Sequence, residues 1–466
     1  MAGLLWALFA VALGGLLVYR FVGFAALQPR WAAWLLTFGA GVSLGIGLTS
    51  VVFFLLRLAL PAVPGISVWL EIALLVGIGY EIFRTRKPAA VGNTKNGFLL
   101  NLLLACAVLL ALAVATIAMA GAWEANPWGN WDAWSIWNLR ARFLATGGEL
   151  SHRAWAPTLG SHPEYPLLIS AFVARCWVYG HSMSAAVPIA TSYLYLLALL
   201  SLTAGGLAVL RSQSLGWLGG LAILGTPAVL HEVPAQYADI PLGCYMAGAL
   251  LFLLLEHPVL GGVLASMAAW TKDEGLLFLA VFLAMTAAFR GRQVLRAGAG
   301  ALPVSILVIA FKAVLVRGTP SLLGVSVPGF LSRIEVPGRY WQIIGAFGSG
   351  FASMASGWYH PLWPVLVLVF VLRFDRTRRQ DLLFSGGICA LMLAGYFTIY
   401  LITANDLMWQ LQTSLGRLLV QLWPCFLVAF LVSLRTPESL GWAPLSAGAQ
   451  PQAKRASRNT KAPRRR

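Results

Sequence analysis

One carboxylate stands apart from the other acids of the chain because of its surroundings. Asp132 lies among five tryptophans within residues 123–140. Tryptophan prefers the headgroup layer of a membrane, and an interfacial aromatic belt explains these side chains. Such a belt needs no carboxylate, however. We therefore interpret Asp132 as a candidate functional carboxylate at the start of a helix over 135–144 that lies flat in the interface.

Two further acids precede apolar runs. Glu164 follows His162 at the end of the same loop, and Asp239 follows Tyr237 in a later one. An acid that enters a membrane segment is costly and is by default a functional candidate. Both acids are also suited to cap the N-terminus of a helix, and His162 adds a titratable ring. Together with Asp132, these carboxylates suit the activation of a hydroxyl or the coordination of a divalent cation.

Two cations complete the set of candidates. Lys272, with Asp273 and Glu274, interrupts what would otherwise be one apolar hairpin over 259–289. As a point charge Lys272 suits a phosphate, with the two acids balancing it; an outer turn of solvated charges is the alternative. Arg417 stands at a predicted membrane boundary, where it suits bidentate phosphate binding. Snorkelling of its side chain to the lipid headgroups explains that position equally well.

The composition shows which elements must position these side chains. Of 466 residues, 59% are hydrophobic and only 11% are charged, and the mean hydropathy is +0.78. Soluble domains are about 45–50% apolar and about 25% charged, so a water-soluble enzyme is excluded. Helices satisfy their own backbone hydrogen bonds in lipid. We expect an all-α, polytopic integral membrane protein with about 13 transmembrane helices.

Apolar runs place the predicted helices. They lie at residues 2–19, 31–56, 66–83, 98–122, 185–210, 215–230, 240–256, 259–271, 275–289, 298–316, 360–372, 383–403 and 418–434. A shorter run at 166–179 is predicted to be re-entrant or interfacial, because a full crossing would reverse the side of every later loop. The predicted regions are N-terminal helices 1–97, a catalytic core 98–434 with the outer loop 123–165, and a disordered cytoplasmic tail 435–466.

Basic residues predict the orientation of the chain. Lys and Arg number 33 against 16 Asp and Glu, a formal net charge of +17. Their clusters within 84–95, 290–296 and 373–379 and in the tail mark the cytoplasmic side. The candidate residues then lie on the opposite side. We expect the tail to contact anionic lipid headgroups and no nucleic acid. The five cysteines show no CxxC spacing, so neither a metal cage nor a disulfide framework is indicated.

In this order, the short motifs resemble those of the GT-C superfamily of membrane glycosyltransferases. That superfamily includes protein O-mannosyltransferases and aminoarabinose transferase-like enzymes. The resemblance covers about residues 98–434 and departs from the family pattern in the additional N-terminal helices and in the lack of a soluble extracytoplasmic domain at the C-terminus. The matching segments are Trp131–Trp134, His162–Pro166, Tyr237–Pro241, Thr271–Gly275 and Ser414–Leu419.

The resemblance implies an activity and a role for each residue. A polyprenyl phosphate-linked sugar would be the donor, and a lipid, a glycan or a protein the acceptor. Asp132 would be the general base of an inverting transfer, and Glu164 and Asp239 would orient acceptor or donor. Lys272 and Arg417 would bind the donor phosphate. Further site candidates are His162, Tyr237, Asp273 and Glu274.

Other readings of the sequence stay open. No cofactor is predicted; a divalent cation is an alternative, although no DxD pair stands in an outer loop. The compact loops favour a bacterial inner membrane with an extracytoplasmic site. A lipid or solute transporter would place ionisable groups near the bilayer midplane, where Glu71 and Lys312 are the candidates. A polytopic scaffold would tolerate the loss of Asp132.

Overall fold

The protein is almost entirely helical. The computed structural model describes residues 1–23, 27–60, 63, 65–84, 98–159, 162–316, 327–354, 356 and 359–440. Within these ranges there is no β-strand, only two isolated β-bridges. The expected all-α fold is confirmed. Most of the predicted basic tail lies outside the described residues, as do Arg86, Lys87 and Lys95 of the first predicted cytoplasmic cluster.

Within the described residues, eight helices are long and apolar enough to cross a membrane. They are α1 (Ala2–Phe21), α2 (Arg30–Ala59), α3 (Ile66–Arg84), α4 (Phe98–Ala125), α7 (Ala186–Leu210), α13 (Gln293–Ala310) with the π-helical turn η4 (Phe311–Leu315), α17 (Arg379–Ile402) with the short η5 (Arg376–Arg378), and α18 (Leu407–Ser433). A ninth is present if α8 (Gln213–Leu224) and α9 (Pro227–Ala235), which meet at a bend of 60°, form one broken span. The expected count of about 13 spans is therefore not confirmed.

The remaining apolar runs form helices that fail this test for physical reasons. Of the helices formed by these remaining runs, four have 16 residues or fewer, namely α6 (Leu168–Tyr179), α10 (Asp239–Leu254), α11 (Pro258–Thr271) and α16 (Leu362–Leu372). At 1.5 Å per residue even 16 residues reach only about 24 Å, short of a hydrocarbon layer of about 30 Å. The 18-residue α12 (Asp273–Arg290) has charges at both ends. Because α10 is buried at every position, its apolar sequence reflects packing against protein.

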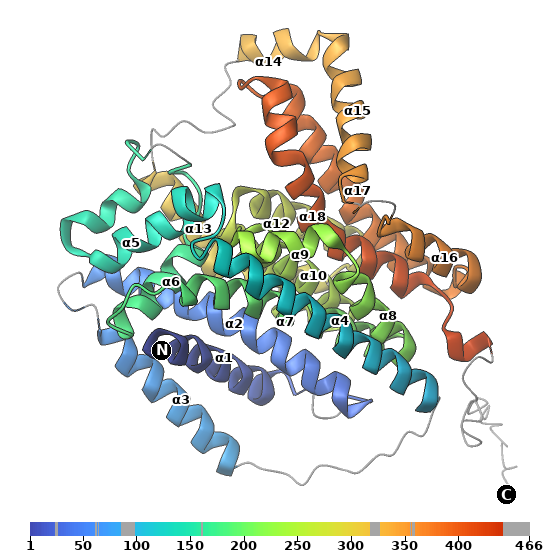
Figure 1. Ribbon diagram of the computed structural model, residues 1–466, viewed down its shortest axis with the longest axis horizontal. Coiled ribbons are helices and arrows are strands. Elements are labelled where there is room, and N and C mark those ends of the chain that lie inside the picture. Colours follow the sequence, from blue (N-terminus) through green and yellow to red (C-terminus); the bar gives the residue numbers. More distant parts are fainter. Residues whose placement is uncertain are drawn as a thin grey trace, which may run out of the picture.

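Helix α10 lies at the centre of the bundle, in contact with α7, α11 and α18 (Figure 1). The N-terminal helices belong to the same body, because α2 packs on α7 and α6 as well as on α1. Glycines permit the close approach of α1 to α2: a Cβ at Gly14 would lie 2.0 Å from the carbonyl oxygen of Gly41, and one at Gly45 would lie 2.0 Å from that of Ala10. The predicted N-terminal region is thus packed directly against the core.

Successive helices α10 to α13 run back and forth between two ends of the bundle. At one end, Asp239 at the start of α10 meets Lys272, which directly follows α11. At the same end, Asp273 at the start of α12 meets Lys312 in η4. We call this the site end, because predicted site residues gather there.

The opposite end carries the basic clusters and we call it the basic end. Arg290, the last residue of α12, pairs with Asp381 in the first turn of α17 at 2.6 Å. Arg211 after α7 pairs with Asp375 at 2.8 Å. These two ion pairs fix the ends of α7 and α12 to the segment that begins α17, away from the site end.

At the site end, two helices from the segment between η4 and α16 extend the bundle. Figure 1 shows α14 (Val327–Ile334) across the tip of α17 and α18, with α15 (Pro337–Ala352) descending beside them. Arg333 donates to the carbonyl of Ile402 at 3.1 Å, and Arg339 donates to those of Leu401 and Tyr400 at 3.1 and 2.9 Å. These cations satisfy the last carbonyls of α17 and so fix α15 against α18.

Candidate active site

The site end brings together all nine residues singled out in the sequence. They come from the loop after α4, from the α9–α10 connection, from the break between α11 and α12, and from α18. Ion pairs, hydrogen bonds and ring contacts hold them in three groups. The nine residues are Asp132, His162, Glu164, Tyr237, Asp239, Lys272, Asp273, Glu274 and Arg417.

Asp132 and Arg417 form the first part of the site. An Nη1 group of Arg417, on α18, donates to Oδ2 of Asp132. The guanidinium carbon of Arg417 lies 5.0 Å from the centroid of the Tyr237 ring, within the range of a cation–π contact. Burial and the Asp132 carboxylate raise the pKa of Tyr237, so its hydroxyl is protonated at neutral pH. The predicted base and the predicted phosphate-binding cation thus contact each other directly.

Local backbone contacts position Asp132. Gly129 adopts a positive φ of 76°, and a Cβ there would lie 2.6 Å from the carbonyl oxygen of Ala235. That same carbonyl accepts from the backbone amide of Asn130 at 3.1 Å. Gln236 donates to the carbonyl of Pro127 at 3.0 Å. The segment before Asp132 is therefore attached to the end of α9, which also leads to Asp239.

Lys272 is the centre of a second group. Its Nζ lies 3.0 Å from Oδ1 of Asp239 and 3.2 Å from Oε1 of Glu274. The side chains of Lys272 and Asp239 are 4% and 1% exposed, so this is a fully buried pair. The ammonium also lies 5.9 Å from the centroid of the Tyr165 ring. Arg417 attracts Asp239 electrostatically, which connects this group to the first.

The third group surrounds Glu164. Oε1 of its carboxylate lies 3.0 Å from Nδ1 of His162. Its backbone carbonyl accepts a hydrogen bond from Nζ of Lys312 at 2.6 Å. Lys312 also bonds Asp273 at 2.5 Å. Burial acts to raise the pKa of Glu164, but the hydrogen bond and charge of His162 and the charge of Lys312 outweigh it, so the pKa is lowered. Glu164 is accordingly a carboxylate at neutral pH.

The structure adds two cations that the site prediction lacked. Lys312 was considered only as a transporter candidate, yet it lies at the site end. Arg140, on α5 (Asn138–Thr146), is buried and donates to the carbonyls of Ala154, Pro163 and Tyr165 at 2.5, 3.2 and 2.6 Å. Burial lowers the pKa of Arg140 to about 9, so it remains charged at neutral pH. The signal for it in the sequence is the alternation of apolar and basic residues over 135–144, where Arg142 follows Arg140.

Glu232 is an acid of the site that sequence reasoning missed. It lies on α9, is 8% exposed, and interacts electrostatically with Asp239, Arg417, Lys272 and Asp132. Its position between two apolar runs is the same signal that identified Asp239. Sequence alone does not show that α9 turns this side chain towards Arg417.

A cavity of about 380 Å³ lies beside Arg417. Glu232 and His231 of α9 line one wall, and residues of α18 and of the segment after α15 line the rest. This volume is within the range of small-molecule sites, about 300–1,000 Å³. The first part of the site therefore borders a space in which a ligand can be bound.

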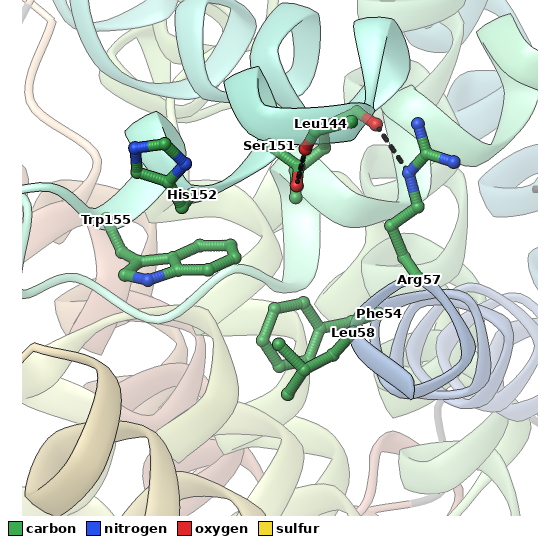
Figure 2. A pocket seen from close by; sticks show the side chains of 8 residues that line it. Phe54, Arg57, Leu58, Leu144, Ser151, His152 and Trp155 are labelled. Carbon is green, nitrogen blue, oxygen red and sulfur yellow. Dashed lines mark hydrogen bonds between the residues drawn. The ribbon is translucent and has the colours of Figure 1, made fainter. Parts of the chain in front are cut away.

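A second cavity of about 200 Å³ lies apart from these groups. Figure 2 shows Phe54 and Arg57 of α2 facing His152 and Trp155 of the short helix η3 (Gly148–Trp155). Nε of Arg57 donates to the carbonyl of Leu144 at 3.2 Å. None of the nine predicted residues lines this cavity.

Acids at the site end are paired with cations, as Asp132 is with Arg417 and Asp239 with Lys272. Among the residues that the structure describes, no group of three or more His, Cys, Asp or Glu side chains is arranged to hold a metal ion. A comparison of the chain with known protein families, with curated proteins and with solved structures finds no match. The function must therefore be inferred from the chemistry of the site.

Proposed function

We propose that the protein is a membrane glycosyltransferase that moves a sugar from a polyprenyl phosphate-linked donor to an acceptor hydroxyl or amine. The observation that carries the proposal is the contact of Asp132 with Arg417 beside a cavity of about 380 Å³. Glycosyl transfer to a nucleophile needs a base for the acceptor, a cation for the leaving phosphate and room for a sugar ring. These three features meet at one place.

The contact of Asp132 with Arg417 supports a role for each residue in the proposed reaction. Asp132 takes the proton of the acceptor as the acceptor oxygen or nitrogen bonds to the anomeric carbon. The bond from that carbon to the phosphate oxygen breaks, and its electron pair leaves with polyprenyl phosphate. Arg417 stabilises the charge on that phosphate. A single displacement of this kind inverts the anomeric centre.

The ion pair itself suggests how the site is controlled. The Arg417 guanidinium is bonded to Asp132. A donor phosphate competes for the same guanidinium, and bidentate phosphate contacts are strong. In our proposal, donor binding draws Arg417 away from the carboxylate and leaves Asp132 available as a base only when the leaving group is present.

The buried groups around this pair have supporting roles in the proposal. Lys272 is already bonded to Asp239 and Glu274, which favours Arg417 as the main phosphate ligand. Lys272 adds to the electrostatic attraction of the phosphate. Asp239 and Glu164 orient the substrates. Lys312 fixes Asp273 and the backbone of Glu164.

The proposal places the site end on the extracytoplasmic side of a bacterial inner membrane. Support comes from the basic end, where Arg211, Arg290 and Arg378 gather, because basic residues concentrate on the cytoplasmic side. The polyprenyl chain of the donor would lie against apolar helix surface. A lipid, a glycan or a protein on that side is the acceptor.

The transporter alternative finds less support. Of its two candidates, Glu71 is buried in an ion pair with Arg175 of α6, and Lys312 belongs to the site end. Neither is left facing a path along the bundle. A buried pair between α3 and α6 instead fixes the peripheral helix α3 to the body.

The test is sugar transfer by the purified protein in nanodiscs, measured as release of polyprenyl phosphate from mannose, glucose, galactose and aminoarabinose donors. Asp132→Asn should lower the rate by about 10²–10⁴-fold, the usual contribution of a general base. Glu335→Gln, which changes an exposed carboxylate on α14's C-terminal side, is the control and should retain the rate. Equal rates for Asp132→Asn and wild type would remove Asp132 from the mechanism. No release from any donor by the wild type would count against the transferase.

A further inference from the structure

The cavity beside Arg417 contains a carboxylate that the proposed mechanism does not use. Glu232 is more than nine-tenths buried, and its Oε2 has no hydrogen-bond donor among the residues that the structure describes. A buried acceptor without a donor is costly, and more so when it is charged. The opposing Arg417 is bonded to Asp132 instead. Glu232 is therefore a group that is arranged for a donor from outside the chain.

The rest of the cavity wall is polar in a particular way. His231 and Glu232 of α9 line the cavity together with Gln412, Thr413 and Arg417 of α18. Amide, hydroxyl and imidazole groups exchange hydrogen bonds with hydroxyls. The lining thus offers a cation, neutral polar groups and the carboxyl oxygens of Glu232, which accept from hydroxyls.

We propose that this cavity binds the sugar ring of the donor and that Glu232 recognises the ring by accepting hydrogen bonds from its hydroxyls. Arg417 binds the phosphate at the other end of the same ligand. The inference rests on the proposed function, since it names the residue that distinguishes a sugar-bearing lipid from polyprenyl phosphate alone. A sugar phosphate fits this lining: its hydroxyls supply the donors that Glu232 lacks, and its phosphate supplies the anion for Arg417.

If Glu232 had only a structural role, its replacement would change the stability of the protein rather than the binding of a ligand. A side chain that only fills space is better replaced by a neutral isostere, and a structural carboxylate would have a partner whose loss destabilises the protein. Glu232→Gln removes the charge and preserves the shape. We expect the ligand-free variant to unfold at the same temperature as the wild type or at a higher one.

The experiment compares two ligands with the same lipid chain in nanodiscs. Equilibrium dissociation constants are measured by thermophoresis for polyprenyl phosphate and for its mannose, glucose and galactose esters. The wild type should bind at least one ester more tightly than polyprenyl phosphate. Glu232→Gln puts an amide donor in place of one acceptor oxygen, so it should weaken the binding of that ester by about 10-fold and leave the binding of polyprenyl phosphate unchanged. Glu256→Gln, an exposed carboxylate near the basic end, is the control and should behave as the wild type.

A second variant tests the cavity independently of Glu232. Gln412 is exposed on α18, so Gln412→Ala should fold normally and weaken the same ester by about 3-fold, again without an effect on polyprenyl phosphate. If both variants keep the wild-type preference for the ester, or if the wild type has no such preference, the inference is overturned while the transferase proposal stands. If the wild type binds polyprenyl phosphate no better than Arg417→Gln does, the proposed function itself fails.

Discussion

Arg417 and Lys272 each contact carboxylates. Lys272 is the more deeply buried, and its partners Asp239 and Glu274 lie within 3.2 Å. Charges in such a place are stable only as a set, because the loss of one partner leaves the other buried and unpaired. At the scale of single residues, the site is therefore more sensitive to neutralising one charge than to removing a whole pair.

This sensitivity can be measured on Lys272 and Asp239. Asp239→Asn should lower the free energy of unfolding by about 3 kcal/mol, the lower end of the effect of breaking a buried pair, because Glu274 still contacts the ammonium. The double variant Asp239→Asn, Lys272→Met should recover most of that loss and remain inactive in sugar transfer. Unfolding by titration with sodium dodecyl sulfate gives both values. A double variant that is no more stable than the single one would show that the two residues are not coupled.

At the scale of elements, the site depends on connections that join helix ends. Arg140 is the clearest example, because its one guanidinium donates hydrogen bonds to the carbonyls of residues 154, 163 and 165. It thereby gathers a segment with little regular structure of its own next to α6. The carbonyls would otherwise be buried without donors. Glu164 and Tyr165 are positioned by this one side chain.

We predict that Arg140→Met loosens the segment between α5 and α6. Three buried carbonyls lose their donor, and the free energy of unfolding should fall by about 3 kcal/mol or more. Arg140→Lys keeps the charge but has a less extended set of donors, and should fall between this variant and the wild type. Limited proteolysis is the measurement, with faster cleavage expected between residues 147 and 165. Cleavage rates that stay at the wild-type value would contradict this role.

Sequence reasoning singled out residues that the structure brings together at the site end, whereas its count of about 13 spans is not confirmed. Asp132, Lys272 and Arg417 could be singled out because a charge beside an apolar run is rare and costly. The number of spans could not be predicted, because an apolar run has the same composition whether lipid or protein surrounds it; α10 is the clearest case, since protein buries it throughout. The partner of each charge was also beyond reach, and Glu232 was missed, because these contacts join segments far apart in the chain.

At the scale of the whole molecule, the ion pairs divide the bundle into two chemically different ends. The basic end carries arginine pairs such as Arg290 with Asp381, and the site end carries the buried acids. Eight helices of sufficient length connect these ends. A bilayer around those helices would therefore hold the two ends on opposite faces.

The accessibility of single cysteines tests this arrangement. In a variant in which the five native cysteines are replaced by serine, Asn405→Cys lies between α17 and α18 near the site end, and Arg292→Cys lies between α12 and α13 at the basic end. Both positions are exposed. A membrane-impermeant maleimide added to intact cells should label residue 405 and reach residue 292 only after lysis, because basic loops stay cytoplasmic. Labelling of both from one side would contradict the two-ended arrangement.

The contact of Asp132 with Arg417 also has a consequence for biosynthesis. The two residues are 285 positions apart, and α18, which supplies the arginine, is the last long helix that the structure describes. At a synthesis rate of about 5–20 residues per second, Asp132 waits roughly a quarter of a minute to a minute before its partner has been made. During that interval the nascent chain carries an uncompensated acid next to the membrane. A chain that stops before α18 keeps this acid without its partner.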